Sequence, residues 1–80
     1  MNKERRLLLK EIVAQLERAE ERVREIWNEE ERNYDQRTLA TKETDQGVRS
    51  KEAIEQLEQA SDSIEKACEA IRQVIESPDF

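Results

Sequence analysis

Carboxylates are the most numerous polar groups in this chain of 80 residues, which holds 20 acidic residues and no histidine. Two acids one helical turn apart, with a second such pair on a later helix, bind Mg²⁺ in all-α nucleotide pyrophosphatases, because hard cations take oxygen ligands from a common face. Glu17 and Glu20 have this spacing, but the second pair would be Glu76 and Asp79, which straddle Pro78. Since such spacings arise by chance among so many acids, we expect neither a metal site nor metal-dependent catalysis.

The chain also lacks the groups that most other enzyme mechanisms need. Without histidine there is no imidazole base to activate a nucleophile, and the usual nitrogen ligand for zinc or iron is missing. Cys68 is the only cysteine, so it forms no disulfide within the chain, and we interpret it as a small core residue. The sequence therefore predicts a protein that is not an enzyme and binds no cofactor.

Aromatic and cationic residues come together near the middle of the sequence. Trp27 and Tyr34 lie one heptad apart, and Arg32, Arg37 and Thr38 are close to them in the chain. A ring that stacks on a nucleobase, beside guanidinium and hydroxyl groups that bind its phosphate, is the set of groups that holds a nucleotide. The alternative is that both rings fill the wide end of an oligomer core, which we favour for Trp27 and leave equally open for Tyr34.

A second basic cluster lies at the start of the chain, where Lys3, Arg5, Arg6 and Lys10 outnumber a single acid, Glu4. Positive charge at the beginning of a helix opposes the helix dipole, so this cluster is a candidate site for an anion or an acidic partner. A solvated charged surface is the commoner outcome. Arg5 and Arg6 join the aromatic cluster as candidate ligand-binding residues.

Apolar residues recur at alternating steps of three and four in both halves of the chain, which is the heptad pattern of packed helices. In each half a companion column with a spacing of seven runs beside this seam and widens the apolar stripe. The first seam and its companion are Leu9, Ile12, Leu16, Ala19, Val23, Ile26 and Val13, Glu20, Trp27, Tyr34. The second seam and its companion are Ala53, Leu57, Ala60, Ile64, Ala67, Ile71, Val74 and Ile54, Ser61, Cys68, Ile75.

Two glutamates, Glu20 and Glu30, interrupt the apolar positions of the first half. One interpretation is a buried anion that contacts a ligand or a metal. The other is a carboxylate that reaches water or pairs with a neighbour such as Arg24, four residues beyond Glu20. We favour the second interpretation.

One break in the heptad pattern divides the chain into two helices of a single domain. Asn2 and Thr44 are suited to cap these helices, and Pro78 ends the second one because the residue before a proline leaves the helical region. Gly47 costs its helix about 1 kcal/mol relative to alanine, so that turn is expected to fray or to need a small residue. The expected ranges are about 3–36 and about 45–76 for the helices, about 37–44 for the connection and 77–80 for a tail.

Two such helices form an antiparallel hairpin about 45 Å long, since each helical residue adds about 1.5 Å. A lone hairpin has no third layer to cover the companion columns, and contiguous exposed apolar surface marks a partner surface. We therefore expect an all-α hairpin that assembles into a four-helix-bundle dimer, or into a higher homo-oligomer because alanines allow close helix approach. The expected oligomer interface comprises Val13, Trp27, Ile54, Cys68 and Ile75.

Charge and hydropathy narrow the choice of partners. A net charge of -6 argues against nucleic-acid binding, which depends on basic residues that neutralise phosphates. No apolar run exceeds the three residues Leu7 to Leu9, so neither a signal peptide nor a membrane span is expected. We expect an acidic protein of the reducing cytoplasm, with neither nucleic acid nor a membrane as its partner.

The sequence resembles a family of short phage and prophage proteins from Clostridia and related gut bacteria, which are mostly uncharacterised. Although this chain lacks the proline expected in the connection, the resemblance spans nearly its whole length. The matching features are Met1 to Arg6, the acids Glu29 to Glu31, Tyr34 with Asp35, and the stretch from Glu52 to Ile64. This resemblance implies a location in the cytoplasm of a bacterial host cell, and small helical phage proteins without catalytic residues are often inhibitors of host defence.

The resemblance and the residues together suggest a function by binding. The leading hypothesis is an anti-defence sponge that sequesters a nucleotide-derived signal, such as a cyclic nucleotide or cyclic ADP-ribose, at a site between protomers. The candidate ligand-binding residues are Tyr34, Arg37, Trp27, Arg32, Thr38, Arg5 and Arg6. The alternatives are an inhibitor or adaptor that binds a host defence protein, and a purely structural helical assembly module.

Overall fold

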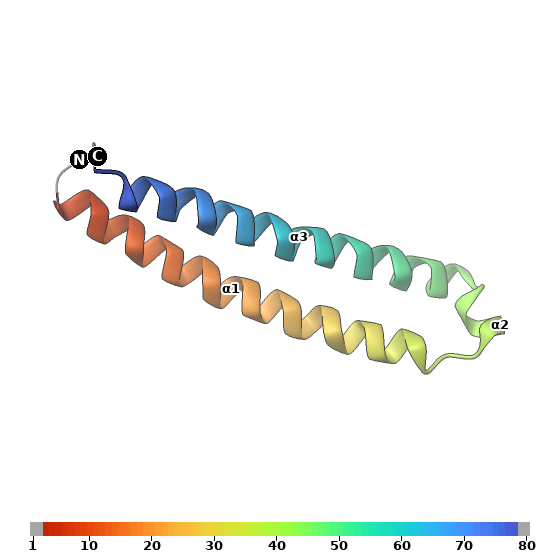
Figure 1. The fold of residues 1–80 in the computed structure, drawn as a ribbon. Coiled ribbons are helices and arrows are strands. Elements are labelled where there is room, and N and C mark those ends of the chain that lie inside the picture. The colour runs from red at the N-terminus through yellow and green to blue at the C-terminus, as the bar shows by residue number, and fades with distance from the viewer. Residues whose placement is uncertain (1–2, 79–80) are drawn as a thin grey trace.

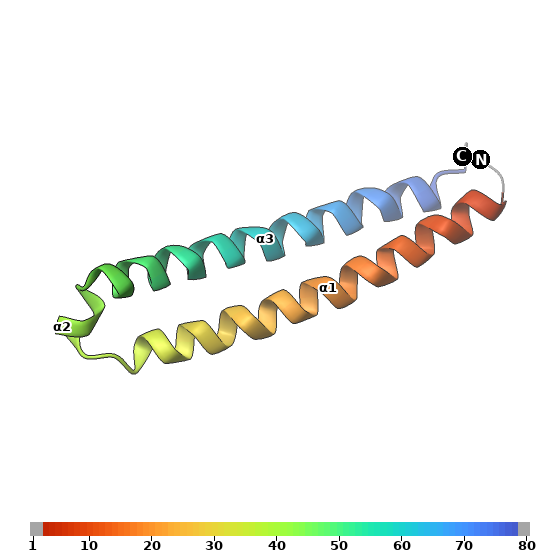
Figure 2. The same ribbon diagram turned by 180° about the vertical axis from the view of Figure 1, so that it is seen from behind.

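The computed structural model describes residues 3–78 and consists of two long antiparallel helices joined at one end. Helix α1 spans Lys3–Asp35, the short helix α2 spans Leu39–Lys42, and helix α3 spans Asp45–Glu76. The start of α1 and the end of α3 lie together at the end of the hairpin opposite α2 (Figures 1 and 2). The molecule is a rod of 58 × 16 × 14 Å. The predicted all-α hairpin is confirmed over the described residues. Within these residues, no helix combines the length and the hydropathy that a membrane span requires.

Local capping sets the ends of α3. The Thr44 hydroxyl oxygen accepts a hydrogen bond from the backbone N–H of Gly47 at 3.1 Å, as an N-cap residue does. At the other end the chain becomes extended at Ser77, directly before Pro78. These bounds coincide with the range expected from the sequence, whereas the expected N-cap of the first helix, Asn2, lies outside the described residues.

The connection contains a helical turn that the sequence did not predict. Thr38 caps α2 by accepting a hydrogen bond from the Thr41 N–H at 3.3 Å, and the Thr44 hydroxyl donates to the Thr41 carbonyl at 2.6 Å. A four-residue helix has no heptad periodicity, and helices this short depend on caps and tertiary contacts. The expected connection over 37–44 therefore contains a helix at residues 39–42, which corrects the prediction there.

Gly47 allows α2 to approach the first turn of α3. A Cβ at this position would lie 2.4 Å from the carbonyl oxygen of Lys42 and 2.6 Å from that of Thr41, far inside contact distance. The cost of a glycine in a helix is thus offset by a close backbone approach that no other residue permits. The sequence alternative of a first turn that needs a small residue is the one the structure shows.

Each long helix carries three adjacent apolar columns, and burial identifies which of them meet. The inner columns, which are buried or half-buried, are Val13, Glu20, Trp27, Tyr34 and Ile54, Ser61, Cys68, Ile75. The middle columns, which are half-buried throughout, are Leu9, Leu16, Val23 and Leu57, Ile64, Ile71. The outer columns, which are exposed except for half-buried Val74, are Ile12, Ala19, Ile26 and Ala53, Ala60, Ala67, Val74.

This arrangement corrects the expected seam. The helices pack through the inner and middle columns, so the residues expected as companions lie inside the hairpin and the outer columns face away. Val13, Trp27, Ile54, Cys68 and Ile75 therefore line the contact between helices of one chain, where Val13 and Cys68 are only 7% and 3% exposed. The interpretation of Cys68 as a core residue is confirmed. Val13 and Cys68 are buried within one chain, whereas Trp27, Ile54 and Ile75 are half-buried, and the assignment of these residues to an oligomer interface stays a prediction.

Candidate functional site

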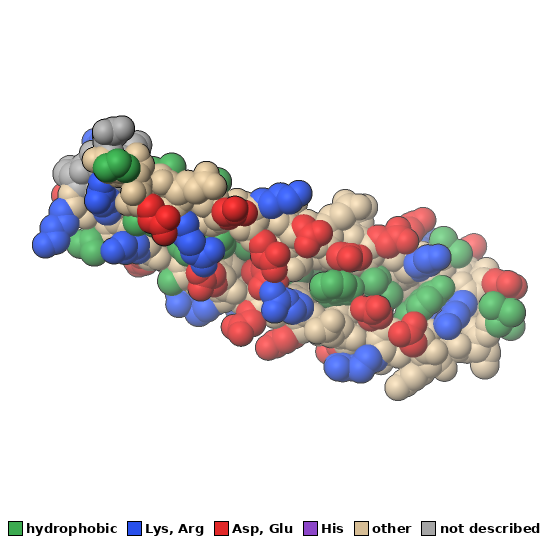
Figure 3. Space-filling view, viewed as in Figure 1, with side chains coloured by type: hydrophobic (Ala, Val, Ile, Leu, Met, Phe, Trp, Pro, Cys, Tyr) green, Lys and Arg blue, Asp and Glu red, His purple; other side chains and the backbone are tan. Residues whose placement is uncertain are grey.

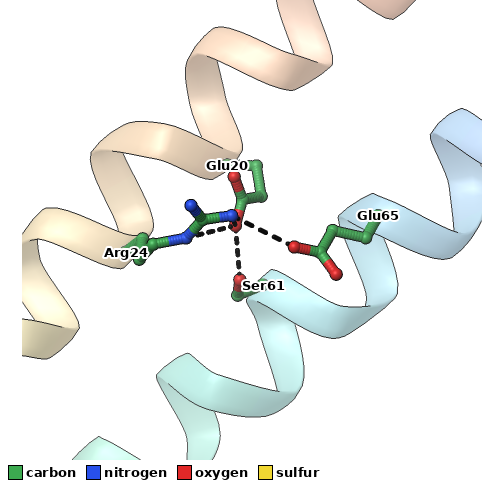
Figure 4. A network of polar contacts seen from close by, with 4 residues as sticks. All are labelled: Glu20, Arg24, Ser61 and Glu65. Atoms are coloured by element: carbon green, nitrogen blue, oxygen red, sulfur yellow. Dashed lines mark hydrogen bonds and ion pairs between the residues drawn. The ribbon is translucent and has the colours of Figure 1, made fainter.

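A polar cluster crosses the middle of the hairpin, centred on Glu20. This residue lies in the inner column of α1 and is 7% exposed. Its Oε1 atom accepts hydrogen bonds from the Ser61 hydroxyl at 2.7 Å and from the Nε and Nη2 atoms of Arg24 at 3.0 and 2.6 Å (Figure 4). Arg24 also donates from Nη2 to Glu65 at 3.1 Å. The cluster thus joins two residues of α1 to two of α3.

The hydrogen bonds keep Glu20 ionised. The hydrogen bond from Ser61 is the main cause that lowers the pKa of Glu20 below its ordinary value of 4.5, and Arg24 adds to it, against the opposing effect of burial. The hydrogen bond to Glu20 in turn raises the pKa of Arg24. A carboxylate that accepts three hydrogen bonds and has a lowered pKa is a poor proton acceptor, so the cluster is suited to holding the helices in register rather than to acid–base catalysis.

A second ion pair lies one heptad along the same flank, where Arg72 of α3 pairs with Glu17 of α1. Glu17 and Glu20, the acids with the spacing of a metal-binding pair, are therefore each engaged by a different arginine. Among residues 3–78 no group of three side chains is arranged to hold a metal ion, and Asp79, the last member of the second predicted pair, lies outside this range.

An open groove of about 420 Å³ lies over this flank. Most of the acids and arginines in its lining pair with one another: Arg24 with Glu20 and Glu65, and Arg72 with Glu17. Arg18 and Glu21 add one further charge of each sign. Cys68 lies at its base, with its side chain buried. Because these opposite charges compensate each other, the groove has no region of a single charge sign that would attract an anion or a cation.

The aromatic cluster is partly assembled at the α2 end of the rod. Tyr34 is half-buried in the inner column, and the Nζ atom of Lys42 lies 5.0 Å from the centroid of its ring, a cation–π contact. Arg37 follows the end of α1 and is half-buried, whereas Arg32 is exposed. Lys42 was not predicted, because only the fold of α2 brings it back over a ring eight residues earlier.

Thr38 and Trp27, two other predicted residues of this cluster, have structural roles. Thr38 caps α2. Trp27 is half-buried in the inner column, and its Nε1 atom is buried with no hydrogen-bond acceptor among the described residues. Trp27 therefore lies between the two helices of one chain, and its place in an oligomer core stays a prediction.

Arg5 and Arg6 lie at the opposite end of the rod from Tyr34 and Arg37, so one chain does not bring the predicted ligand-binding residues together. The Nη2 atom of Arg6 donates a hydrogen bond to the backbone carbonyl of Ser77 at 2.9 Å. The basic start of α1 therefore lies beside the C-terminal end of α3, where cations are stabilised by the helix dipole. This position accounts for positive charges that oppose the dipole of their own helix.

The outer columns form the remaining surface, which we call the open face. Ile12 and Ile26 are 41% and 57% exposed, and they share this face with the exposed alanines of α3. By helical spacing, the positions that border the outer columns are Leu8, Gln15, Arg22, Glu29 and Arg49, Gln56, Ser63, Ala70. Counted together with the seven outer-column residues, only three of these fifteen side chains are charged, in a chain that is 42% charged. The open face is thus an apolar strip with few charges.

In comparisons with known proteins, no family model, no curated protein and no solved structure matches the chain.

Proposed function

We propose that the chain is a non-enzymatic binding protein whose working form is a homo-oligomer of hairpins. The observation that carries this proposal is the exposure of the middle columns, since Leu16 and Ile64 and their neighbours stay half-exposed although they lie at the centre of each apolar stripe. A helix that packs against one neighbour needs two columns. Three adjacent columns are the pattern of a helix with two neighbours.

A four-helix bundle uses all three columns. In that arrangement the inner columns contact the other helix of the same chain, the outer columns contact a helix of another chain, and the middle columns form the central core. The open face is then an interface, in agreement with its few charges. The dimer that the sequence suggests is retained, but through the outer columns.

Light scattering coupled to gel filtration tests this proposal. We expect the wild-type chain to elute as a homo-oligomer, and Ile26→Glu to shift it to a monomer because the new charge lies in the interface. Asn28→Glu is the matched control, since the same charge then lies on an exposed residue away from the open face. A wild-type monomer at all concentrations, or equal behaviour of both variants, would contradict the proposal.

We further propose, as the ligand of this assembly, a nucleotide-derived signal bound near the α2 end. The contact of Lys42 with the Tyr34 ring favours this candidate, because it places an aromatic group and a cation together beside the half-buried Arg37. The resemblance to small phage proteins supports the same class of ligand, and with it an anti-defence role.

Thermal unfolding with a panel of cyclic nucleotides and cyclic ADP-ribose isomers tests the ligand. A ligand at one hundred times its Kd stabilises the folded protein by about 2.7 kcal/mol, which the melting temperature reports. We expect the stabilisation to be lost in Tyr34→Ala combined with Arg37→Glu, and kept in Lys66→Glu, which changes an exposed residue of α3 away from the open face. No stabilisation of the folded oligomer by any member of the panel would overturn the ligand while leaving the assembly in place.

A further inference from the structure

We infer that the open face is covered by a second copy of this chain that runs in the opposite direction, so that the two α2 ends lie at opposite ends of a four-helix dimer. This inference rests on the proposed function, because it takes self-association through the outer columns as given. It adds the number of chains and their orientation. Three properties of the described residues support it: the surface area, the order of residues in the outer columns and the distribution of charge.

The surface area of one hairpin exceeds that of a compact protein of its size. A compact monomer of this mass exposes about 5,000 Å², whereas the hairpin exposes 6266 Å². The excess of roughly 1,200 Å² is larger than the approximately 800 Å² that each partner buries in a typical stable interface. One copy of this chain on the open face, in an interface of typical size, would therefore remove about two thirds of the excess.

Over three positions each, the outer columns read the same in both directions, while Val74 extends the column of α3 beyond these three positions. In α1 the order is Ile12, Ala19, Ile26, and in α3 it is Ala53, Ala60, Ala67. The hydrogen bond between Glu20 and Ser61 places the middles of the two columns at similar heights along the rod. A copy turned end over end then brings its Ile12 to Ile26 of the first copy, and the central alanines to each other. A single two-fold axis satisfies both helices, as a symmetric dimer requires.

Charge decides between the two possible directions. Residues 20–61, the half nearer α2, hold twelve acidic and seven basic side chains, whereas residues 3–19 and 62–78 hold seven of each. In Figure 3 the acidic side chains gather over the middle and the α2 half, and basic ones gather at the end with the termini. Copies that run in the same direction would superimpose two acidic halves. The opposite direction instead places the basic start of each α1 beside the acidic half of the other copy, which lowers the repulsion.

Distances between spin labels test the orientation directly. Leu8 lies at the terminal end beside the outer column and is 53% exposed, so it accepts a label with little disturbance. The chain used would carry Leu8→Cys together with Cys68→Ala, which removes the only native thiol. Since Leu8 lies about twelve helical residues from the middle of the rod, we expect two labels about 35 Å apart in the antiparallel dimer. In a parallel dimer, in which both α2 ends lie at the same end, the two labels would lie less than about 20 Å apart, because packed helices are separated by about 8–10 Å.

A mixed sample provides the matched control. Arg49 borders the outer column of α3 near the α2 end, so Arg49→Cys in the same background labels the other end of the rod. In heterodimers of the two labelled chains, the antiparallel orientation predicts a short distance and the parallel orientation a long one. Circular dichroism confirms that each labelled chain is folded.

The outcomes separate this inference from the proposed function. A dimer with long distances between identical labels and short ones in the mixture supports the orientation. A dimer with the reverse pattern overturns the orientation and keeps self-association. A trimer or tetramer overturns the dimer, and a monomer overturns both the inference and the proposed function.

Discussion

The two sides of the hairpin are built differently. On the flank that holds Glu20, the helices are joined by contacts between particular atoms, which include the Ser61 hydrogen bond and the pairs of Arg24 with Glu65 and of Arg72 with Glu17. The open face instead presents Ile26 and its neighbours to solvent with few charges around them. The difference indicates that the first side fixes how the two helices of one chain meet, and it is the second side that we propose another chain covers.

The largest expected loss of stability tests whether the middle columns pack against one neighbouring helix or against two. Leu16 is only half-buried in the hairpin, so its truncation in a lone chain would cost little. In a four-helix assembly Leu16→Ala removes a core side chain and is expected to cost about 2–5 kcal/mol per chain. Denaturant unfolding at several protein concentrations measures this. The same change in the Ile26→Glu background is expected to cost less than half as much, and equal costs would show that no second layer covers Leu16.

The next largest effect concerns the close approach of α2 to the first turn of α3 at Gly47. On helix propensity alone, Gly47→Ala would stabilise α3 by about 1 kcal/mol. Because the added Cβ would overlap the carbonyl oxygens of Lys42 and Thr41, we expect a loss of about 1–3 kcal/mol instead. Gln59→Gly compared with Gln59→Ala, at an exposed position of α3 away from the open face, is a control for the propensity term. A gain of stability in Gly47→Ala would contradict the close approach of α2.

The polar cluster is expected to make stability depend on pH. Since the pKa of Glu20 is lowered in the folded chain, its contribution is fully present above the ordinary value of 4.5 and is lost as the pH falls below it. The difference in free energy of unfolding between wild type and Glu20→Gln should therefore shrink between about pH 6 and pH 3. Glu25→Gln, an exposed acid on the same helix, is the control. A difference that stays constant with pH would show that Glu20 is not stabilised as an anion.

The smallest effect lies at the terminal end. Arg6→Gln removes a cation from the C-terminal end of α3 and its hydrogen bond to Ser77, and is expected to cost about 0.3–1 kcal/mol. The loss should decrease in high salt, because partly exposed charges are screened. Arg22→Gln, near the middle of α1, should show no such loss. Equal effects of the two changes would assign the loss to helix propensity rather than to the end of α3.

Periodicity and capping residues predicted the elements well, because both are local. The alternating steps of three and four located both long helices, and Thr44 with Pro78 marked the ends of α3. The pairing of Glu20 with Arg24 also follows from a spacing of four. Helix α2 was missed, since a single turn held by Thr38 has no periodicity of its own.

The choice of the inner column could not be read from periodicity, because in both helices the middle column is flanked by two candidate columns. Contacts between residues far apart in the sequence identify the inner one: Glu20 bonds to Ser61, 41 residues away. The matching polar residues in the two companion columns were the available signal for that pairing. For the aromatic cluster the limit was similar, since Lys42 reaches Tyr34 only after the chain has turned at α2.

Trp27 gives the hairpin an internal optical reporter. It is the only tryptophan, and its indole N–H is enclosed between the helices without an acceptor among residues 3–78. An indole that is shielded from water emits at shorter wavelength than one in solvent, so its emission spectrum records whether the α2 half of the hairpin is closed. Separation of the helices there would shift the emission to the red even if the helical content stayed the same, which distinguishes opening of the hairpin from melting of its helices.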